Sequence, residues 1–482
     1  MTIDVRSIDR LMRMVVFLVV VGGCPTAHAQ CQEGCKAIHI LTGEATGDQF
    51  GWKSNYIGDV TSDGITDFVI TAPTNDGGGS NAGRIYVYSS SDGSEVWRAT
   101  GVSNSGQLGI DANRTGDINS DGTPDVIAGG PFSGAGRAVV YSGVDGDILH
   151  TFFGQVNTDR FGFRVAGGGD ANGDGHPDLL VGATFHDAVA FNAGRVYLYD
   201  GTDFSLLCTV DGEGVSDEFG SALAFVGDRD NDGRDEFIVG ARNAGPTSGG
   251  RAYLYSYNGK TCDLVHTFVP PAGAVGFGSL FADGGRDINN DGTPDIYVAD
   301  FNANRAHVYS GADFSQLWML TGNGNGGFGL GEMIDDVNGD DHVDLVLAAW
   351  VSNNGGFQAG KVFVYSGADG SILETFTHDI PGATFGFDAN GLGDVNDDGK
   401  ADYLITAAWD LNQRGRAYVI AGTISPTVVG DLDGDGSVGA SDLLILLVNW
   451  GRCADCDDCP ADLNGDCSVG AADLLILLVN WA

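Results

Sequence analysis

The chain has 482 residues, which is long enough for one large repeat domain and a small second domain. Its formal net charge is −41 with only 24 Lys and Arg residues, so nucleic acid and anionic membrane surfaces are poor partners, because binding to either needs basic patches. The 77 glycines fall at turns between β-rich runs, and low-complexity sequence is therefore excluded.

Residues 1–29 have the features of a secretory signal peptide. Three arginines precede an apolar run at 14–21, and the small residues of Ala27-His28-Ala29 suit a cleavage site. Val21-Gly-Gly-Cys24 gives a lipoprotein alternative. No other stretch approaches the roughly 20 apolar residues of a membrane span. We therefore expect a secreted, extracellular protein without membrane insertion, with cell-surface association as a further option.

Nine cysteines leave eight once Cys24 is removed with the leader, and an even number in an exported protein favours disulfides. Cys208 and Cys262 occupy equivalent parts of neighbouring repeats. Cys453, Cys456, Cys459 and Cys467 cluster near the C-terminus, where zinc is the alternative to disulfides.

The segment Asp170-Ala-Asn-Gly-Asp-Gly-His-Pro-Asp178 defines a loop that occurs seven times. It places oxygen-bearing side chains at positions 1, 3, 5 and 9, and Gly175 at position 6 allows a turn with positive φ. Ca²⁺ takes six to eight oxygen ligands, which this spacing supplies. A polar hairpin turn would explain one copy, but not seven at intervals of 49 to 59 residues.

The expected calcium ligands of the seven loops are Asp59, Thr61, Asp63 and Asp67; Asp117, Asn119, Asp121 and Asp125; Asp170, Asn172, Asp174 and Asp178; Asp228, Asp230, Asp232 and Glu236; Asp287, Asn289, Asp291 and Asp295; Asp336, Asn338, Asp340 and Asp344; and Asp394, Asn396, Asp398 and Asp402.

Each repeat carries four short apolar segments separated by turn residues, which predicts antiparallel strands. In the third repeat these are Phe161–Ala166, Leu179–Gly182, Arg195–Tyr199 and Leu206–Val210. The acidic loop joins the first strand to the second. The first strand opens with Phe-Gly in six copies and with Leu108-Gly109 in the other.

These Phe-Gly pairs and acidic loops resemble the FG-GAP repeats of the integrin α β-propeller and its bacterial relatives. The resemblance covers about residues 36–423. It implies a mostly β fold, a seven-bladed propeller at 30–423, with its calcium loops on one face and its ligands on the opposite face.

The two ends of the repeat region favour a closed ring over an open solenoid. Residues 37–43 look like a fourth strand without a blade of their own, whereas the last repeat stops after its third strand at Ile420. The N-terminal strand is therefore expected to complete blade seven, because closure removes open sheet edges.

A basic residue opens the third strand of every repeat. A sevenfold binding surface is conceivable, but ion pairing between blades or packing of the side-chain stem on aromatic rings is the preferred interpretation. The residues are Arg84, Arg137, Arg195, Arg251, Arg305, Lys361 and Arg416.

After a linker at 424–429, residues 430–482 hold two further loops of EF-hand spacing, each followed by a Leu-rich run that predicts a helix. Side-chain ligands at positions 1, 3, 5 and 12 match the EF-hand pattern, with Asp in place of the usual Glu at position 12. They are Asp431, Asp433, Asp435 and Asp442, then Asp462, Asn464, Asp466 and Asp473. We expect the second loop to bind calcium more weakly, because Cys467 replaces the turn glycine and Asn464 replaces a carboxylate.

Loop plus outgoing helix, twice, resembles the dockerin module, and with the propeller loops it implies up to nine structural Ca²⁺ ions. A cohesin-like module is therefore a candidate partner. Two departures weaken that implication: positions 10 and 11 hold Ala440-Ser441 and Ala471-Ala472, and the helices lack basic residues.

The leading functional hypothesis is a secreted, calcium-binding, non-catalytic propeller that binds an extracellular protein or glycan ligand, with the C-terminal module serving extracellular assembly. No catalytic motif occurs, so no catalytic residue is assigned. Candidate contact residues follow the second strands: Phe185, His186, Arg242, Trp350, Trp409 and Asp410. Packing is the alternative for each.

The alternative function is a glycoside hydrolase or polysaccharide lyase with its site on the same loop face, which would need a carboxylate pair or a base beside calcium. Its candidate carboxylates are Asp187, Asp217, Glu218 and Asp300. A passive coat or scaffold component is a third possibility.

Overall fold

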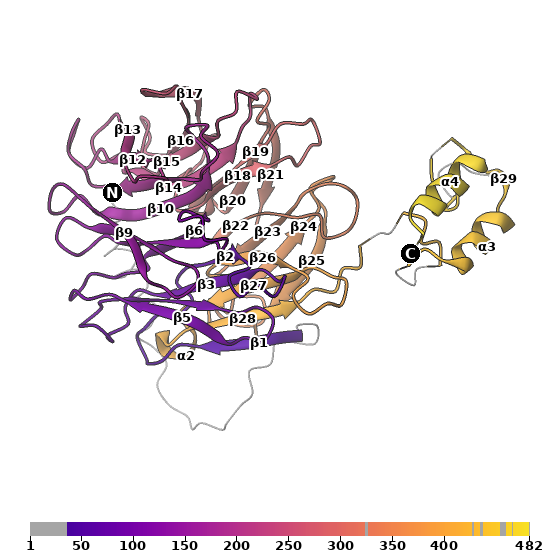
Figure 1. Cartoon of the computed structure of the whole chain (residues 1–482), viewed down its shortest axis with the longest axis horizontal. Helices are drawn as coiled ribbons and strands as arrows, with labels where there is room; N and C mark the ends of the chain where they lie inside the picture. The colour runs from indigo at the N-terminus through magenta and orange to yellow at the C-terminus, as the bar shows by residue number, and fades with distance from the viewer. Residues whose placement is uncertain are drawn as a thin grey trace. The chain divides into compact units, whose positions relative to one another are not determined.

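The computed structural model describes residues 36–322, 326–426, 429–433, 437–453, 459–464 and 466–481. The expected signal peptide and Cys31, Cys35, Asp435 and Cys456 lie outside these residues. Seven four-stranded antiparallel sheets form the blades of a β-propeller (Figure 1), which confirms the expected fold.

Each blade takes its strands in order from the axis outward, and their bounds are as follows. Blade one has β2 (Ser54–Gly58), β3 (Asp67–Ala72), β4 (Arg84–Tyr88) and β5 (Glu95–Thr100); blade two β6 (Asp111–Gly116), β7 (Asp125–Gly130), β8 (Arg137–Tyr141) and β9 (Ile148–Phe153); blade three β10 (Phe161–Gly169), β11 (Asp178–Ala183), β12 (Arg195–Tyr199) and β13 (Leu206–Asp211). Blade four has β14 (Phe219–Gly227), β15 (Glu236–Ala241), β16 (Arg251–Tyr257) and β17 (Cys262–Phe268); blade five β18 (Ala282–Arg286), β19 (Asp295–Asp300), β20 (Arg305–Tyr309) and β21 (Gln316–Thr321); blade six β22 (Phe328–Ile334), β23 (Asp344–Ala349), β24 (Lys361–Tyr365) and β25 (Ile372–Thr377); blade seven β26 (Ala389–Gly393), β27 (Asp402–Ala407), β28 (Arg416–Ala421) and β1 (Lys36–Thr42). Short helical turns, η1 (Phe301–Ala303) and α2 (Asp410–Gln413), follow the second strands of blades five and seven.

Blade seven is closed by the N-terminal strand, as the sequence predicted. β1 pairs antiparallel with β28, from Lys36 opposite Ala421 to Thr42 opposite Arg416. The inner strands β2, β6, β10, β14, β18, β22 and β26 contact one another in this order, and β26 contacts β2. In Figure 1 they surround the centre of the ring, and the fourth strands lie at its periphery. The ring therefore leaves no blade with a missing strand.

Neighbouring blades are joined through the Phe-Gly pair and a glycine that precedes the third strand. Gly136 forms a parallel bridge with Phe161 of the next blade, and four equivalent Gly–Phe or Gly–Leu bridges occur elsewhere in the ring. A Cβ atom at position 136 would lie 2.2 Å from the Phe161 carbonyl oxygen. The backbone φ of Gly136 is +87°. Only glycine allows this close approach between blades.

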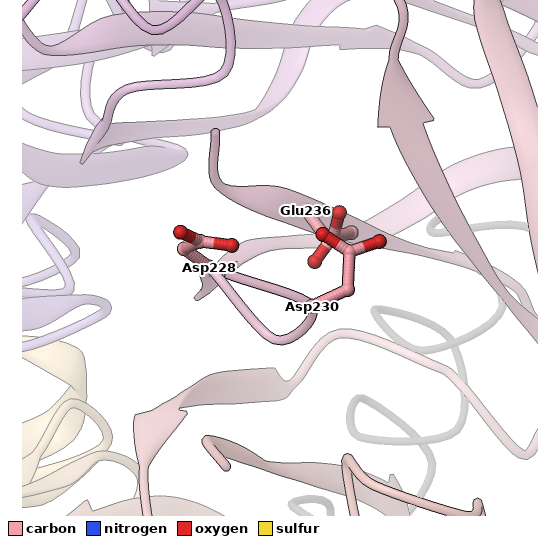
Figure 2. Close-up of side chains that lie close together, drawn as sticks. All are labelled: Asp228, Asp230 and Glu236. Atoms are coloured by element: carbon pink, nitrogen blue, oxygen red, sulfur yellow. The ribbon is translucent and has the colours of Figure 1, made fainter. Parts of the chain in front are cut away.

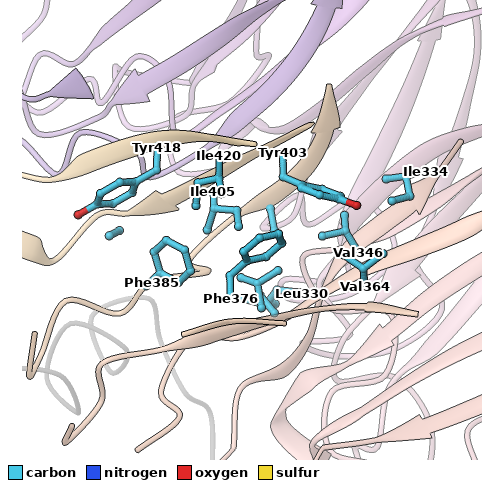
Figure 3. Close-up of a cluster of buried hydrophobic side chains, with 14 of the residues drawn as sticks. Leu330, Ile334, Val346, Val364, Phe376, Phe385, Tyr403, Ile405, Tyr418 and Ile420 are labelled. Atoms are coloured by element: carbon cyan, nitrogen blue, oxygen red, sulfur yellow. The ribbon is translucent and has the colours of Figure 1, made fainter. Parts of the chain in front are cut away.

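The apolar core fills the space between successive blades. In the largest cluster, Val346 and Val364 of blade six pack with Tyr403, Ile405 and Ile420 of blade seven (Figure 3). A disulfide between Cys208 and Cys262 links β13 to β17, and therefore joins the outer strands of blades three and four covalently. This confirms a disulfide at the two cysteines that occupy equivalent repeat positions.

Two details of the strands differ from the sequence prediction. Second strands begin at position 9 of the acidic loop, one residue earlier than expected, because that residue pairs with the end of the first strand, as Asp178 does with Gly169. In four blades the Phe-Gly or Leu-Gly pair precedes the first strand; β2, for example, begins only at Ser54. There the pair serves the contact between blades instead of the sheet.

The C-terminal segment contains helices α3 (Ala440–Val448) and α4 (Ala471–Val479), with the short strands β29 (Gly451–Arg452) and β30 (Ser468–Val469) paired antiparallel. Leu446 and Leu477, one from each helix, are buried in its core with Val438, Ala461 and Val469. No helix among the described residues is long and apolar enough to cross a membrane.

Ring closure gives a first prediction. Deleting residues 30–43 should lower the melting temperature by about 5 °C or more, because β28 loses its partner strand and the half-buried Ile38 and Leu41 no longer pack on blade seven. Thermal unfolding followed by circular dichroism measures this change.

The matched control uses side chains of the same strand. Leu41→Ala should destabilise the protein by about 1–2 kcal/mol, whereas Ile40→Ala should have little effect, since Ile40 is 45% exposed. A truncated protein that melts like the full chain would show that β1 does not close the ring.

Candidate metal centres and the two loop faces

The acidic loops share one backbone conformation, which the first Asp of each loop organises. Asp59 accepts the N–H groups of Asp63 and Gly64, at 3.1 and 2.8 Å, and the position-1 Asp of the other six loops accepts the equivalent pair. Position 6 has positive φ in every loop, including Asp341, which replaces glycine in blade six at φ +64°. Spacing and turn chemistry therefore set the same fold seven times.

The carboxylate at position 9 is fully buried at the start of each second strand. In blade one, Asp67 Oδ2 accepts the N–H groups of Val60 and Thr61, and Oδ1 accepts the N–H of Ser90 in the turn between the third and fourth strands. The other five aspartates at this position accept the equivalent turn N–H. One side chain thus ties the acidic loop to a second loop of its blade.

Burial raises the pKa of the position-9 carboxyls, because the charged form loses its hydration. The values are about 6 for Asp125, Asp295, Asp344 and Asp402 and about 7 for Asp178 and Glu236. A cation beside these groups would favour their charged forms.

Blade four differs, since Glu236 replaces Asp at position 9. Glu236 Oε2 accepts the Arg229 N–H at 3.1 Å, but Oε1 is buried without a hydrogen-bond partner. The extra methylene brings the carboxylate toward the loop, and oxygens of Asp228, Asp230 and Glu236 lie within 4.8 Å of one another (Figure 2). The orphaned oxygen and the converging carboxylates fit a divalent cation with oxygen ligands.

The remaining propeller loops keep their ligands nearby but less tightly grouped. Within the described residues, only the blade-four loop and the first C-terminal loop bring oxygens of three acidic side chains within 4.8 Å of one another. In three loops Asn at position 3 bonds to the carboxylate at position 5, as Asn119 Nδ2 does to Asp121 Oδ2 at 2.8 Å. In two others, Asn172 and Asn396 donate to the carboxylate at position 9. An Asn side chain that rotates would present its oxygen to an ion.

Hydroxyl groups in the turns between third and fourth strands also reach the loops, a contact that the sequence analysis missed. Ser91 donates to Asp63 at 2.8 Å, and Ser366 to Asp340 at 3.3 Å. The recurrence of Ser at the start of these turns was the available signal.

In the C-terminal segment, the position-12 aspartates both organise a loop and cap a helix. Asp442 accepts the N–H groups of Leu432 and Gly439 at 2.7 Å, and Asp473 accepts that of Gly470 at 2.7 Å. Oxygens of Asp431, Asp433 and Asp442 lie within 4.8 Å of one another. The fourth expected ligand of this loop, Asp435, lies outside the described residues.

The cysteine-rich stretch contains a disulfide between Cys453 and Cys459, which removes these two thiols as zinc ligands. Cys467 has φ +66°, the left-handed conformation expected at the turn position of the second loop.

The two faces of the ring differ in their loops. We call the face with the loops between first and second strands the acidic-loop face, and the face with the loops that follow the second and fourth strands the distal face. Strand direction alone places these sets at opposite ends of each blade, because all the strands are antiparallel.

Three of the expected contact residues on the distal face are buried and paired. His186 Nδ1 lies 2.7 Å from Asp159 Oδ2, Arg242 forms an ion pair with Glu218, and Asp410 pairs with Arg416 at 3.2 Å. Their assignment as ligand contacts was wrong, since loops from adjacent connections cover them. The packing alternative holds for these three.

The aromatic candidates are partly buried. Phe185 lies under the Arg160 guanidinium at 3.5 Å, and Trp350 packs edge-on against Phe387 at 5.5 Å. Trp409 Nε1 is buried without a hydrogen-bond partner among the described residues. These contacts also indicate a role in packing.

The carboxylates proposed for an enzyme are mostly engaged in local structure. Asp217 accepts the Gly214 N–H at 2.7 Å, Asp300 accepts that of Val275 at 3.0 Å, and Glu218 pairs with Arg242. Asp187 is exposed and accepts the Asn192 N–H. This arrangement does not support a glycosidase pair.

The basic residues that open third strands have structural roles where contacts are seen. Arg84 pairs with Glu44 at 2.6 Å, Arg195 with Asp211 at 2.5 Å and Arg251 with Glu213 at 3.3 Å. Lys361 lies over the Phe363 ring at 4.7 Å. These contacts indicate structural roles for the four residues. Arg195 and Asp211 lie opposite each other on adjacent strands of blade three, so that pair does not link two blades as expected.

Exposed large apolar residues gather on the distal face, which the sequence analysis also missed. They lie in loops after the second or fourth strands and are Val102, Val156, Val189, Phe191, Val215, Val269, Val275 and Phe357. Phe191 is 64% exposed and Phe357 59% exposed. Such residues in two sets of loops at one end of the ring indicate an interaction surface.

Comparison with known proteins agrees with this fold. The FG-GAP repeat profile matches residues 53–88 and 161–199, which hold the first three strands of blades one and three. Integrin alpha-5 of Xenopus laevis is 31% identical over 214 residues, 41% of this chain and 20% of that protein.

Two further integrin chains show similar likeness. Human integrin alpha-IIb is 34% identical over 178 residues, 33% of this chain and 17% of that protein. Integrin alpha-6 of Gallus gallus is 30% identical over 168 residues, 33% of this chain and 16% of that protein. The chain thus spans about a fifth or less of the length of these relatives. It contains FG-GAP repeats in a seven-bladed β-propeller and is homologous over part of its length to integrin α chains.

Proposed function

We propose that this chain is a secreted, non-catalytic binding protein whose propeller binds calcium on the acidic-loop face and an extracellular protein or glycan ligand on the distal face. The observation that carries the proposal is the separation of roles between the faces. Acidic loops with buried carboxylates occupy one, and exposed apolar side chains occupy the loops of the other. Homology to integrin α chains supports an adhesive role.

Calcium is the proposed ion because the candidate ligands are carboxylate, amide and hydroxyl oxygens, which suit a hard cation. Up to seven ions would be held by the propeller loops at the residues given for positions 1, 3, 5 and 9. Their role is structural: an ion bound only in the folded state stabilises it by about 2.7 kcal/mol at a hundredfold excess over Kd.

The segment 430–482 is proposed as a dockerin-like assembly module with two more calcium loops. The evidence for it is the repeated arrangement of loop, capping Asp and helix, with Asp442 and Asp473 in equivalent places. A cohesin-like protein is its candidate partner. Secretion rests on the sequence of residues 1–29.

A second prediction concerns calcium and pH. In the metal-free protein the raised pKa of Asp178 and Glu236 means that the folded state holds protons that the unfolded state releases between about pH 4 and 7. Charging these groups therefore destabilises the metal-free fold as pH rises through this window. Calcium favours the charged carboxylates, so the gain in melting temperature in 1 mM CaCl₂ over EGTA should be larger at pH 7.5 than at pH 5.

The control replaces calcium with an equal ionic strength of NaCl, which should not reproduce the gain. Glu236→Gln should reduce it, whereas Asp145→Asn, in an exposed turn, should not. Equal melting temperatures with calcium and with EGTA at pH 7.5 would show that the loops are only turns.

A third prediction compares the two C-terminal loops. The Asp462–Asp473 loop should bind calcium more weakly than the Asp431–Asp442 loop, because Cys467 adopts a left-handed conformation at a cost of about 1–2 kcal/mol and Asn464 replaces a carboxylate. Each 1.4 kcal/mol corresponds to about tenfold in Kd. Calorimetric titration of residues 428–482 in the oxidised form measures the two sites.

Cys467→Gly tests the cause, since glycine adopts the same conformation without this penalty. It should strengthen the weaker site and bring the two affinities closer, in a titration under reducing conditions alongside the reduced parent. Two equal sites in the parent, or no gain from glycine, would contradict the explanation.

A fourth prediction tests the distal face. The mature protein should bind to immobilised extracellular-matrix proteins or to a glycan array, and the double variant Phe191→Ser/Phe357→Ser should lose about tenfold or more in affinity, because it removes exposed aromatic surface.

The matched control is Ile148→Ser/Leu206→Ser, which alters exposed residues at the start of two outer strands, next to the acidic-loop face. It should bind like the parent. Equal losses in both double variants, or release of reducing sugars or unsaturated products from polysaccharides, would contradict the proposed function.

A further inference from the structure

The propeller encloses an axial cavity of about 440 Å³ that is lined by residues of all seven blades. This volume lies within the range of small-molecule sites, about 300–1,000 Å³. Its wall carries basic and acidic side chains from several blades. Neither metal binding nor the distal face accounts for them.

Three of the basic side chains in this cavity are neutralised by partners. Lys53 Nζ lies 3.0 Å from Asp388 Oδ2, and Arg164 Nη1 lies 3.8 Å from Asp111 Oδ1. Arg286 forms an ion pair with Asp335. Each of these ion pairs joins two neighbouring blades. The three basic residues therefore have a structural role in the ring.

Arg114 is different. It lines the cavity, and its guanidinium lies 4.1 Å from the centroid of the Tyr56 ring. It forms no ion pair or hydrogen bond with any side chain or backbone group that the structure describes. The side chain is only partly buried, so part of its surface stays open within the cavity wall.

Three carboxylates that line the cavity form no ion pair within the part of the chain that the structure describes: Asp235, which accepts the Asp170 N–H at 2.9 Å, Asp283 and Glu332. Asp283 Oδ2 accepts the Met333 N–H at 3.0 Å, and Glu332 Oε1 accepts the Gly391 N–H at 3.3 Å. Neither forms an ion pair among the described residues. Burial and the neighbouring Asp283 raise the pKa of Glu332 to about 8, although Arg114, Lys53 and Arg286 oppose the rise.

Strand register places these groups in one layer of the ring. Asp283 is paired with Tyr297, Glu332 with Val346 and Asn55 with Val69, which are equivalent positions of the second strands. Asn55 is 6% exposed, and its Oδ1 has no hydrogen-bond partner, although its Nδ2 donates to Asn113 Oδ1. Asn55 lies on the Arg114 side of the ring, however, because its strand β2 neighbours β6.

The order of the blades sets the acidic pair opposite Arg114. Asp283 and Glu332 lie on the adjacent strands β18 and β22, and Arg114 lies on β6. Around a ring of seven, β6 is three blades from β18 and three from β22. The blade order thus puts Arg114 on the far side of the ring from Asp283 and Glu332, and Arg114, which pairs with Val126, lies one residue out of register with their layer.

We propose that the axial cavity binds a small zwitterion of the α-amino acid class, with its ammonium group held by Asp283 and Glu332 and its carboxylate held by Arg114. Ammonium is a donor only, which suits the carboxylate oxygens of Asp283 and Glu332 on two adjacent blades. Guanidinium offers a planar pair of donors that suits a carboxylate. The Tyr56 ring beside Arg114 adds an apolar wall.

The experiment uses the mature full-length protein with calcium present. Each of the twenty standard L-α-amino acids is first tested at 1 mM for a rise in melting temperature, and any that stabilises is titrated by calorimetry. We expect at least one to bind with one-to-one stoichiometry. The corresponding amine without the carboxylate, and the corresponding acid without the ammonium group, should each bind at least tenfold more weakly.

Variants identify the site. Glu332→Gln, Asp283→Asn and Arg114→Gln should each weaken binding at least tenfold, and Arg114→Lys should weaken it less, because it keeps the charge. Asp145→Asn, an exposed acid outside the cavity, should leave binding unchanged. Circular dichroism and the melting temperature without ligand confirm that each variant is folded.

Three results would overturn the proposal: no stabilisation by any of the twenty amino acids, equal affinity for the amine or the acid alone, or unchanged binding by folded Glu332→Gln and Arg114→Lys variants. Because Glu332→Gln keeps the shape of the side chain and removes the charge it can carry, it keeps the test valid if Asp283→Asn fails to fold.

Discussion

The propeller depends above all on a carboxyl group buried at the first residue of every second strand. Moving a carboxylate out of water costs several kcal/mol unless other groups replace its hydration. In six blades the aspartate is compensated by N–H groups of the acidic loop and of the segment that follows the third strand, as Asp67 is by Val60 and Ser90. The same bonds hold three segments of the blade in one arrangement.

These hydrogen bonds compensate only part of the cost of burying the carboxylates. The uncompensated part is linked to the acidic composition of the chain. Backbone N–H groups supply partial charges only, while positions 1 and 5 add further carboxylates around each buried one. The raised pKa of Asp178 and Glu236 expresses the cost that remains. A divalent cation is the partner that would offset it, so the net charge of −41 and the stability of the ring have a common origin.

Much of the fold could be predicted because its signals are local or can be counted. Acidic loops, Phe-Gly pairs and strand patterns recur within each repeat. Ring closure could be predicted because the N-terminal end has an extra strand and the last repeat lacks its fourth strand. The sequence could not show which loops of neighbouring blades meet. His186 looked like a surface ligand, yet Asp159 comes from the preceding connection and buries it. The axial charges depend on contacts such as Ser54 with Asp388, which are 334 residues apart in sequence.

The two kinds of ligand site would respond to solution conditions in opposite ways. A cation on the acidic-loop face changes the local charge by two units, so its binding is weakened by salt that screens the attraction. A zwitterion adds no net charge, and the groups that would hold it lie inside the ring, where Asp283, Glu332 and Arg114 are less screened by mobile ions. Ion pairs such as Lys53 with Asp388 link the inner strands around the same cavity. Ligand binding at the axis would therefore act on the contacts between blades, whereas a cation held by the acidic loops would act within each blade.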